Sequence, residues 1–207
     1  QDDPDFAQLV MQFDANDDNA ISRSELVDVY AILDASVSFE IENQLAYMNG
    51  TIDSSTPFRV MELVYYHPEV HTIVMVDVPG SVDDDSSLRA SRIVRKHGLN
   101  THVPTEGDVA SGGTDFFQAG VERTCERGAK FGVHSWAELG AEGTDYPKDD
   151  EVHDMYLDYC AEMGIPESFY WFTLESASAA DIHYMTESEL HEFKMLTHPI
   201  IDLKDAP

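Results

Sequence analysis

The stretch VHTIVMVDVPG, residues 70–80, decides the fold. Its centre is an almost unbroken run of apolar residues rich in Val and Ile, which is typical of a strand buried on both faces. The run ends at Pro79 and Gly80, two residues that favour a turn. The stretch therefore predicts a buried strand that stops at a tight turn.

Segments on both sides of this strand alternate between strand and helix patterns. The expected strands are 41–50, 100–104 and 130–136, and the expected helices are 55–68, 87–98, 150–164, 167–178 and a last one that Thr186 and Glu189 open as a capping box. Residues 106–120 are expected to form a strand, a turn and a helix, and the polar stretch 140–154 an exposed loop leading into its helix. This alternation indicates an α/β fold over residues 38–207, with a largely parallel sheet covered by helices on both faces.

The segment before this domain, residues 1–37, has the pattern of a helix-loop-helix calcium site, an EF-hand. Its loop reads DANDDNAISRSE over residues 14–25, between two segments whose apolar residues recur at helical spacing. Oxygen-bearing side chains stand at alternate loop positions and at the closing position, as a Ca²⁺ site requires. The expected calcium ligands are Asp14, Asn16, Asp18, Ala20 through its carbonyl, Ser22 and Glu25.

This calcium site has a simpler alternative, a polar loop whose Asp and Ser residues only cap helices. Capping does not require acids at alternate positions followed by a closing Glu25, so the pattern favours calcium. Asn19 stands where such loops usually carry Gly, and Asn tolerates the positive φ that the turn needs. Only one such loop is visible in the sequence, so it is either unpaired or paired across a dimer.

The charge of the chain limits its partners. Lys and Arg total 12 against 40 Asp and Glu, a formal net charge of −28, so binding to nucleic-acid phosphates is unfavourable and cations or basic partners fit better.

No apolar stretch reaches the roughly 18 residues of a membrane span. We interpret Gln1 as a processed or trimmed start. Cys125 and Cys160 fit no zinc spacing and form either a disulfide in an oxidising compartment or two buried thiols in a reducing one.

Residues 39–193 resemble the proteolytic subunit of Clp protease and its crotonase-like relatives, especially the bacterial envelope proteins of that superfamily. In that family a strand ends in a proline-glycine turn that supplies an oxyanion-hole amide, and VDVPGSV with Gly80 matches it. The family's nucleophilic serine at a helix start is matched by DVASGG and hence Ser111. Its general-base histidine on the next strand is matched by FGVHSW and hence His134.

The resemblance implies a serine hydrolase in which His134 takes the hydroxyl proton of Ser111. The amides of Gly80 and Gly112 would form the oxyanion hole, and Asp181, before a short strand near the C-terminus, is the closest match to the family's orienting acid. A serine in the first turn of a helix also makes chemical sense by itself, because it faces unpaired backbone amides that can stabilise an oxyanion.

Other interpretations stay open. Ser111 as a helix cap and His134 as a hydrogen-bonded core residue are the structural alternatives. Ser81 replaces the second glycine of the family's turn, and Asp181 is offset from the family's position, which favours a non-catalytic, calcium-dependent binding protein on a degenerate hydrolase fold. A crotonase-like enzyme acting on acyl thioesters would use the oxyanion hole without a Ser–His pair. The resemblance fits a peptide or small acyl substrate, a homo-oligomer, and a periplasmic or secreted location.

Overall fold

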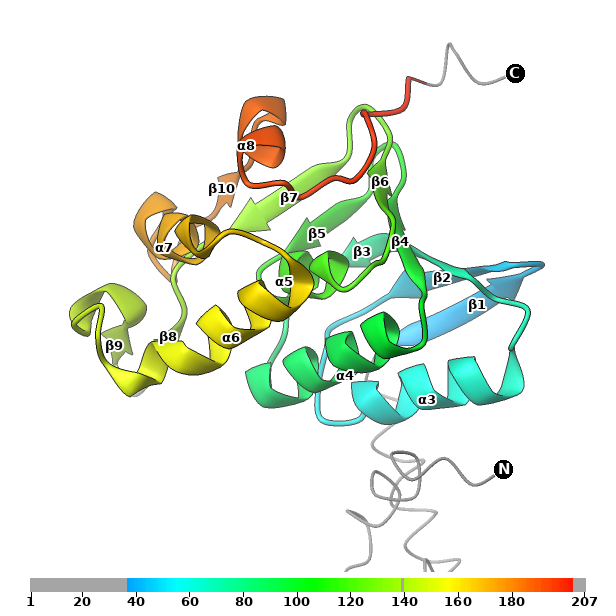
Figure 1. Cartoon of the computed structure of the whole chain (residues 1–207), viewed down its shortest axis with the longest axis horizontal. Helices are drawn as coiled ribbons and strands as arrows, with labels where there is room; N and C mark the ends of the chain where they lie inside the picture. The colour runs from blue at the N-terminus through cyan, green and yellow to red at the C-terminus, as the bar shows by residue number, and fades with distance from the viewer. Residues whose placement is uncertain (1–36, 139, 203–207) are drawn as a thin grey trace, which may run out of the picture.

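The computed structural model describes residues 37–138 and 140–202. The expected EF-hand, with its calcium loop at residues 14–25, lies outside the described residues. The described part contains one central sheet flanked by helices (Figure 1).

The central sheet is mostly parallel, as the strand-helix alternation predicts. Its main path runs, in spatial order, through β1 (Ser38–Glu42), β2 (Leu45–Asn49), β3 (Thr72–Val78), β5 (Asp108–Ala110), β7 (Lys130–Val133) and β10 (His183–Tyr184). The pairs β2–β3, β3–β5 and β5–β7 are parallel, and antiparallel pairing occurs at the two edges, β1–β2 and β7–β10. A separate two-stranded sheet joins β8 (Ala137–Glu138) to β9 (Ala141–Glu142).

The strand expected at residues 70–80 is β3, and it lies where the sheet divides. Its first part, from Thr72 to Val74, pairs with β4 (Asn100–Val103), which in turn pairs with β6 (Arg123–Cys125). Its last residues, Asp77 and Val78, pair instead with β5. Because β3 has neighbours on both sides along its length, its centre is fully buried, which explains the apolar run in the sequence.

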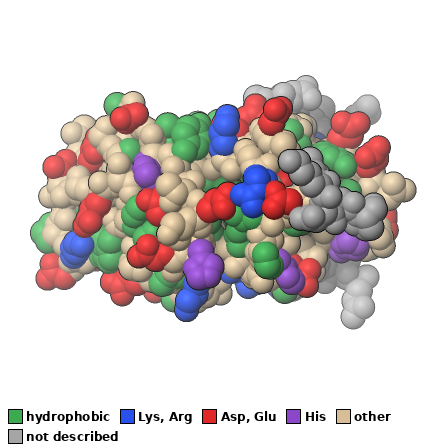
Figure 2. Space-filling view, turned by 90° about the horizontal axis from the view of Figure 1, so that it is seen from above, with side chains coloured by type: hydrophobic (Ala, Val, Ile, Leu, Met, Phe, Trp, Pro, Cys, Tyr) green, Lys and Arg blue, Asp and Glu red, His purple; other side chains and the backbone are tan. Residues whose placement is uncertain are grey.

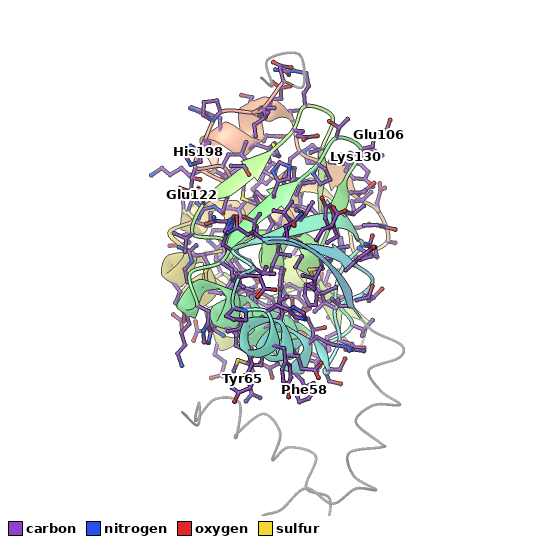
Figure 3. All side chains as sticks on the ribbon, turned by 90° about the vertical axis from the view of Figure 1, so that its right-hand side faces the viewer. Phe58, Tyr65, Glu106, Glu122, Lys130 and His198 are labelled. Atoms are coloured by element: carbon purple, nitrogen blue, oxygen red, sulfur yellow. The ribbon has the colours of Figure 1, made fainter. Side chains whose placement is uncertain are left out.

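Helices pack along the sheet and cover its apolar side chains. They are α3 (Thr56–Tyr66), α4 (Asp84–Lys96), α5 (Gly112–Gln118), α6 (Asp154–Met163), α7 (Glu167–Ser176) and α8 (Glu187–Glu192), with short 3-10 turns at Gly143–Asp145 and Glu151–His153. Helix α3 packs beside α4, α4 beside α5, and α6 beside α7 (Figure 1). Figure 3 shows Phe58 and Tyr65 of α3 at one end of the molecule and Glu122, Lys130 and His198 toward the other.

Side chains cap two helix starts, and the one at Thr186 was expected from the sequence. Asp83 caps α4 by accepting a hydrogen bond from the Ser86 amide at 3.1 Å. Thr186 and Glu189 form the expected capping box at the start of α8, where each side chain accepts from the other residue's amide. These bonds satisfy amides that a helix start leaves without an intrahelical partner.

Some expected elements differ from the observed ones. Residues 41–50 form the end of β1, a turn and β2, because Asn43 adopts a positive φ of 56° and reverses the chain without a Gly or Pro to mark the turn. The expected strand 130–136 ends at Val133, and the helix expected from residue 150 begins at Asp154. Strand β6 has three residues and was not expected, because so short a run carries no clear periodicity.

Both cysteines are free, buried thiols in this structure. Burial raises the pKa of Cys125 to about 11 and that of Cys160 to about 12.

Among the described residues, no helix is long and apolar enough to cross a membrane. Figure 2 shows carboxylates spread over the visible face, with few Lys and Arg side chains among them.

Candidate active site

Three parallel strands bring the expected catalytic residues to one edge of the sheet. Gly80 follows the end of β3, Ser111 directly follows β5, and His134 directly follows β7. Parallel neighbours present their carboxyl ends at the same edge, where open α/β sheets bind ligands. Ser111 and His134 line the same pocket, which encloses about 50 Å³, and both also line an adjoining groove of about 610 Å³.

Ser111 is held in an unusual backbone conformation. Its φ of 51° and ψ of −128° are uncommon for a residue with a side chain. The Ser111 amide donates to the Gly132 carbonyl at 2.9 Å, and the Ser111 carbonyl accepts from the amides of Thr114 at 2.8 Å and Asp115 at 3.2 Å. Such a conformation persists only when the surrounding structure fixes it, and it often occurs at functional sites.

The loop after β3 lies directly against Ser111. A Cβ atom on Gly80, whose φ is +150°, would lie 3.1 Å from the Ser111 Cβ atom, and a Cβ atom on Gly112 would lie 2.3 Å from the Ser81 Oγ atom. Close approach of the two loops excludes a side chain at Gly112, and the positive φ together with the tight contact favours glycine at position 80. Gly112 follows Ser111 directly in the chain, and the close approach brings the backbone of Gly80 against Ser111.

The Ser81 position, where the resembling family has glycine, is firmly held. Ser81 Oγ donates to Asp84 Oδ1 at 2.5 Å, and the Gly80 carbonyl accepts from the Ile52 amide at 2.9 Å. Within the described part of the chain, the amides of Gly80 and Gly112 donate to no protein acceptor. Two such amides beside a serine can stabilise an oxyanion.

The ring of His134 has a defined orientation. Nδ1 lies 2.7 Å from the Ser135 carbonyl oxygen, which can only accept, so Nδ1 carries the proton and Nε2 of the neutral ring is left with a lone pair. This tautomer suits a general base. Within the described residues no hydrogen bond joins Ser111 Oγ to His134, and such bonds often tighten only when substrate is bound.

Asp181 lies outside the pocket. It is exposed, and its Oδ1 atom accepts a hydrogen bond from the Ile182 amide at 2.8 Å. The antiparallel register of β10 and β7 places Asp181 near the end of β7, but in the described structure its carboxylate forms no hydrogen bond with His134. The expected orienting role of Asp181 stays a prediction, and the Ser135 carbonyl holds His134 in this structure.

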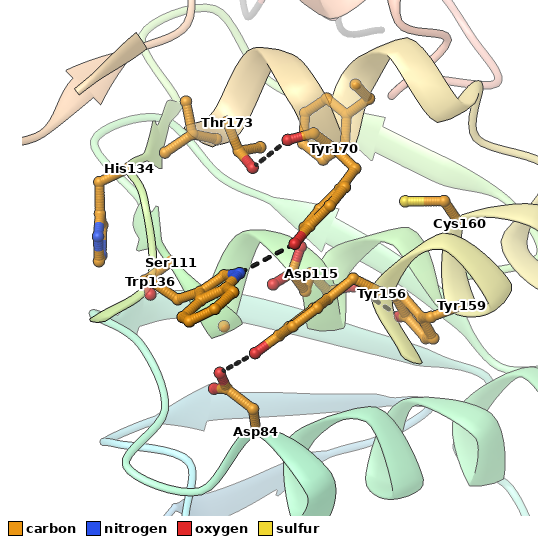
Figure 4. Close-up of a pocket in the computed structure, with 13 residues that line it drawn as sticks. Asp84, Ser111, Asp115, His134, Trp136, Tyr156, Tyr159, Cys160, Tyr170 and Thr173 are labelled. Carbon is orange, nitrogen blue, oxygen red and sulfur yellow. Dashed lines mark hydrogen bonds between the residues drawn. The ribbon is translucent and has the colours of Figure 1, made fainter. Parts of the chain in front are cut away.

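Aromatic side chains that the sequence analysis did not single out form one wall of the pocket. Trp136 stacks on Tyr156 with ring centroids 6.1 Å apart, and Tyr156 stacks on Tyr170 at 5.3 Å. Trp136 Nε1 donates to the Tyr170 hydroxyl at 2.9 Å, and the Tyr156 hydroxyl donates to Asp84 Oδ2 at 2.7 Å (Figure 4). These bonds fix the rings, so the wall is preformed.

Asp115 of α5 is a further pocket residue that the sequence analysis did not single out. It lines the pocket, and burial, with a further contribution from the negative charge of Asp84, raises its pKa to about 7. A hydrogen bond from Gln118 Nε2 to Asp115 Oδ1 at 3.1 Å acts in the opposite direction. Its position four residues after Ser111 could have revealed it, because residues at that spacing share one face of a helix.

Comparisons with known proteins support the fold. No protein-family model matches the sequence, and no curated protein matches it. Among solved structures, a mutant of the 1510-N membrane-bound stomatin-specific protease is similar, with a TM-score of 0.52 and 11% identity, over 80% of this chain and 82% of that chain. The chain has a Clp/crotonase-like fold. This confirms the fold that the resemblance implied.

Proposed function

We propose that this protein is a serine hydrolase that acts on peptides, with Ser111 as nucleophile and His134 as general base. The observation that carries the proposal is the meeting of these two residues at the carboxyl ends of β5 and β7, in one pocket. The positive φ of Ser111 and the Nε2 lone pair of His134 fit those roles.

The proposed reaction follows the usual steps of acyl transfer. Ser111 Oγ attacks the peptide carbonyl while His134 Nε2 takes the hydroxyl proton. The amides of Gly80 and Gly112 donate to the oxyanion of the tetrahedral intermediate. His134 then gives its proton to the leaving amine, and water, activated by the same ring, hydrolyses the acyl-enzyme. The Ser135 carbonyl holds the ring in the required tautomer throughout.

We also propose that the loop at residues 14–25 binds one Ca²⁺ ion and that the protein is periplasmic or secreted. The calcium proposal rests on the sequence pattern alone. Calorimetry of the full chain with CaCl₂ is expected to show one site per chain, and Glu25→Gln is expected to remove it. Unchanged binding in that variant would contradict the proposed ligand set.

Labelling with a fluorophosphonate probe tests the catalytic proposal, because the probe reacts with activated serines. The wild type is expected to react, Ser111→Ala to lose all labelling, and His134→Ala to react far more slowly. Ser38→Ala, at an exposed serine of the edge strand β1, is the matched control and should label like the wild type. If the wild type stays unlabelled with and without calcium, the non-catalytic binding protein becomes the better interpretation.

A further inference from the structure

The pocket beside Ser111 carries negative groups and no compensating positive ones. Asp115 and Asp84 both line it, and no Lys or Arg lies among its described lining residues. Asp84 has two donors, Tyr156 and Ser81, whereas the carboxylate of Asp115 accepts only from Gln118, at Oδ1. The second oxygen of Asp115 has no hydrogen-bond donor in the described structure.

Asp115 is partly buried and lines the pocket beside the proposed nucleophile. Protein surrounds its carboxyl closely enough for burial to be the main cause of its raised pKa. A buried carboxylate is strongly stabilised by a cation that enters its site, because the opposite charge replaces the lost hydration.

The aromatic wall favours the same kind of ligand. Trp136, Tyr156 and Tyr170 are stacked along the pocket, and aromatic rings attract cations as well as the aliphatic stem of a basic side chain. Figure 4 shows Ser111 and His134 on one side of this pocket and Tyr156 and Tyr159 on the other. A side chain held here would therefore lie next to the proposed nucleophile.

We propose that this pocket binds the basic side chain, lysine or arginine, of the residue whose carbonyl Ser111 attacks. The inference rests on the proposed serine hydrolase function and names its substrate class: peptides cleaved after a basic residue. The net charge of −28 supports the same class, because it raises the encounter rate with basic peptides at low salt.

A panel of fluorogenic peptides that differ only at that residue tests the inference. The fluorophosphonate probe first counts active serines, since its reaction does not depend on a basic side chain. Peptides with Lys or Arg are expected to show a kcat/KM at least about tenfold above those with Leu or Glu. A labelled wild type that cleaves the Leu peptide equally well would overturn the substrate class and leave the hydrolase proposal standing. A wild type that is not labelled would overturn both.

The matched variants are Asp115→Asn and Asp158→Asn, which remove the same charge from the pocket and from an exposed position on α6. Asp115→Asn is expected to lower kcat/KM for the Lys and Arg peptides relative to the Leu peptide, so that the preference for basic residues is lost. Asp158→Asn should retain the preference. If Asp115→Asn keeps the full preference, Asp115 does not bind the substrate and the inference is wrong.

A measurement on the wild type covers the case in which Asp115→Asn does not fold. n-Butylammonium is expected to slow probe labelling of Ser111, and n-butanol at the same concentration is not. Equal effects of the two compounds would show that the pocket does not select a positive charge, which would contradict the proposal.

Discussion

Two charged side chains in this domain, the buried Arg123 and the partly buried Asp115, have opposite hydrogen-bonding environments. Arg123 is 6% exposed, and each nitrogen of its guanidinium group donates a hydrogen bond. Nε donates to the Met195 carbonyl at 2.8 Å, and the two terminal nitrogens donate to the carbonyls of Gly120 at 3.2 Å and Lys194 at 3.1 Å. Burial, followed by the charge of Arg95, lowers its pKa, but its hydrogen-bonding capacity is well used.

Asp115, by contrast, has one donor and an unused oxygen that faces a pocket. A buried charge is costly unless it is fully hydrogen-bonded, so Arg123 has the features of a structural group that ties the chain segment around residues 194–195 to the sheet. Asp115 lacks such compensation. This difference fits the ligand-binding role proposed for Asp115, and four stability measurements examine the contrast between the two residues.

Replacing Arg123 should produce the largest effect. Arg123→Met keeps the apolar stem but leaves three carbonyls without their charged donor, two of them in buried hydrogen bonds, so we expect the free energy of unfolding to fall by about 3–5 kcal/mol. Urea denaturation monitored by circular dichroism measures this. A loss below about 1 kcal/mol would show that the carbonyls find other donors or water, and the contrast with Asp115 would disappear.

Asp115→Asn should change stability in a pH-dependent way. The pKa of Asp115 is raised from 3.8 to about 7 in the folded chain, so the folded state binds more protons than the unfolded state between these values. The contribution of Asp115 to the free energy of unfolding of the wild type is therefore fully present below about pH 4, and it is lost as the pH rises through 7. We expect the variant to match the wild type near pH 4 and to be more stable at pH 8, by on the order of 2–3 kcal/mol.

Urea denaturation at pH 4, 5.5 and 8 measures that difference, and Asp158→Asn serves as the exposed control that should show no such pH trend. A variant that is less stable than the wild type at pH 8 would mean that the carboxylate is compensated by interactions other than the Gln118 bond.

Tyr156→Phe should have a smaller effect, because it removes one hydrogen bond and keeps the stacked ring. The Tyr156 hydroxyl donates to Asp84 at 2.7 Å, and its loss should lower the unfolding free energy by about 1 kcal/mol. Asp84 keeps its bond from Ser81, which limits the cost. A loss of several kcal/mol, again by urea denaturation, would show that Asp84 depends on Tyr156 as strongly as the carbonyls depend on Arg123.

Arg127→Ala should have the smallest effect. Arg127 lies four residues after Arg123 and pairs with two carboxylates, Asp202 and Glu187, but all three side chains are exposed. Water and salt screen such pairs, so we expect no measurable change in the urea midpoint. A clear decrease in the urea midpoint would show that these exposed ion pairs stabilise the fold despite their contact with water.

The sequence predicted the fold where local pattern and tertiary environment agree. The apolar run at residues 70–80 became the central strand β3, and the glycine-flanked Ser111 and His134 were brought to one edge because each follows a parallel strand. The capping signal at Thr186 was also confirmed, since a cap depends only on residues a few positions away.

The pocket could not be predicted in the same way. Its wall consists of Trp136 in a loop, Tyr156 of α6 and Tyr170 of α7. These side chains meet only because the three elements pack together, and that packing leaves no periodic pattern in the sequence. Arg123 likewise carries no sign of burial in its local sequence. The proposed calcium loop lies outside the described residues, so its prediction rests on the sequence pattern alone.

The bond between His134 Nδ1 and the Ser135 carbonyl has a consequence for mutational scanning. Every amino acid supplies a carbonyl oxygen, so no substitution at position 135 can delete the acceptor by changing the side chain. A saturation library selected for hydrolysis should therefore show sharp intolerance at Ser111 and His134, whereas losses at the buried position 135 should follow from packing and not from loss of this acceptor. In this arrangement the proposed base is oriented by a backbone atom, so a comparison of residue identities alone would not reveal the group that orients it.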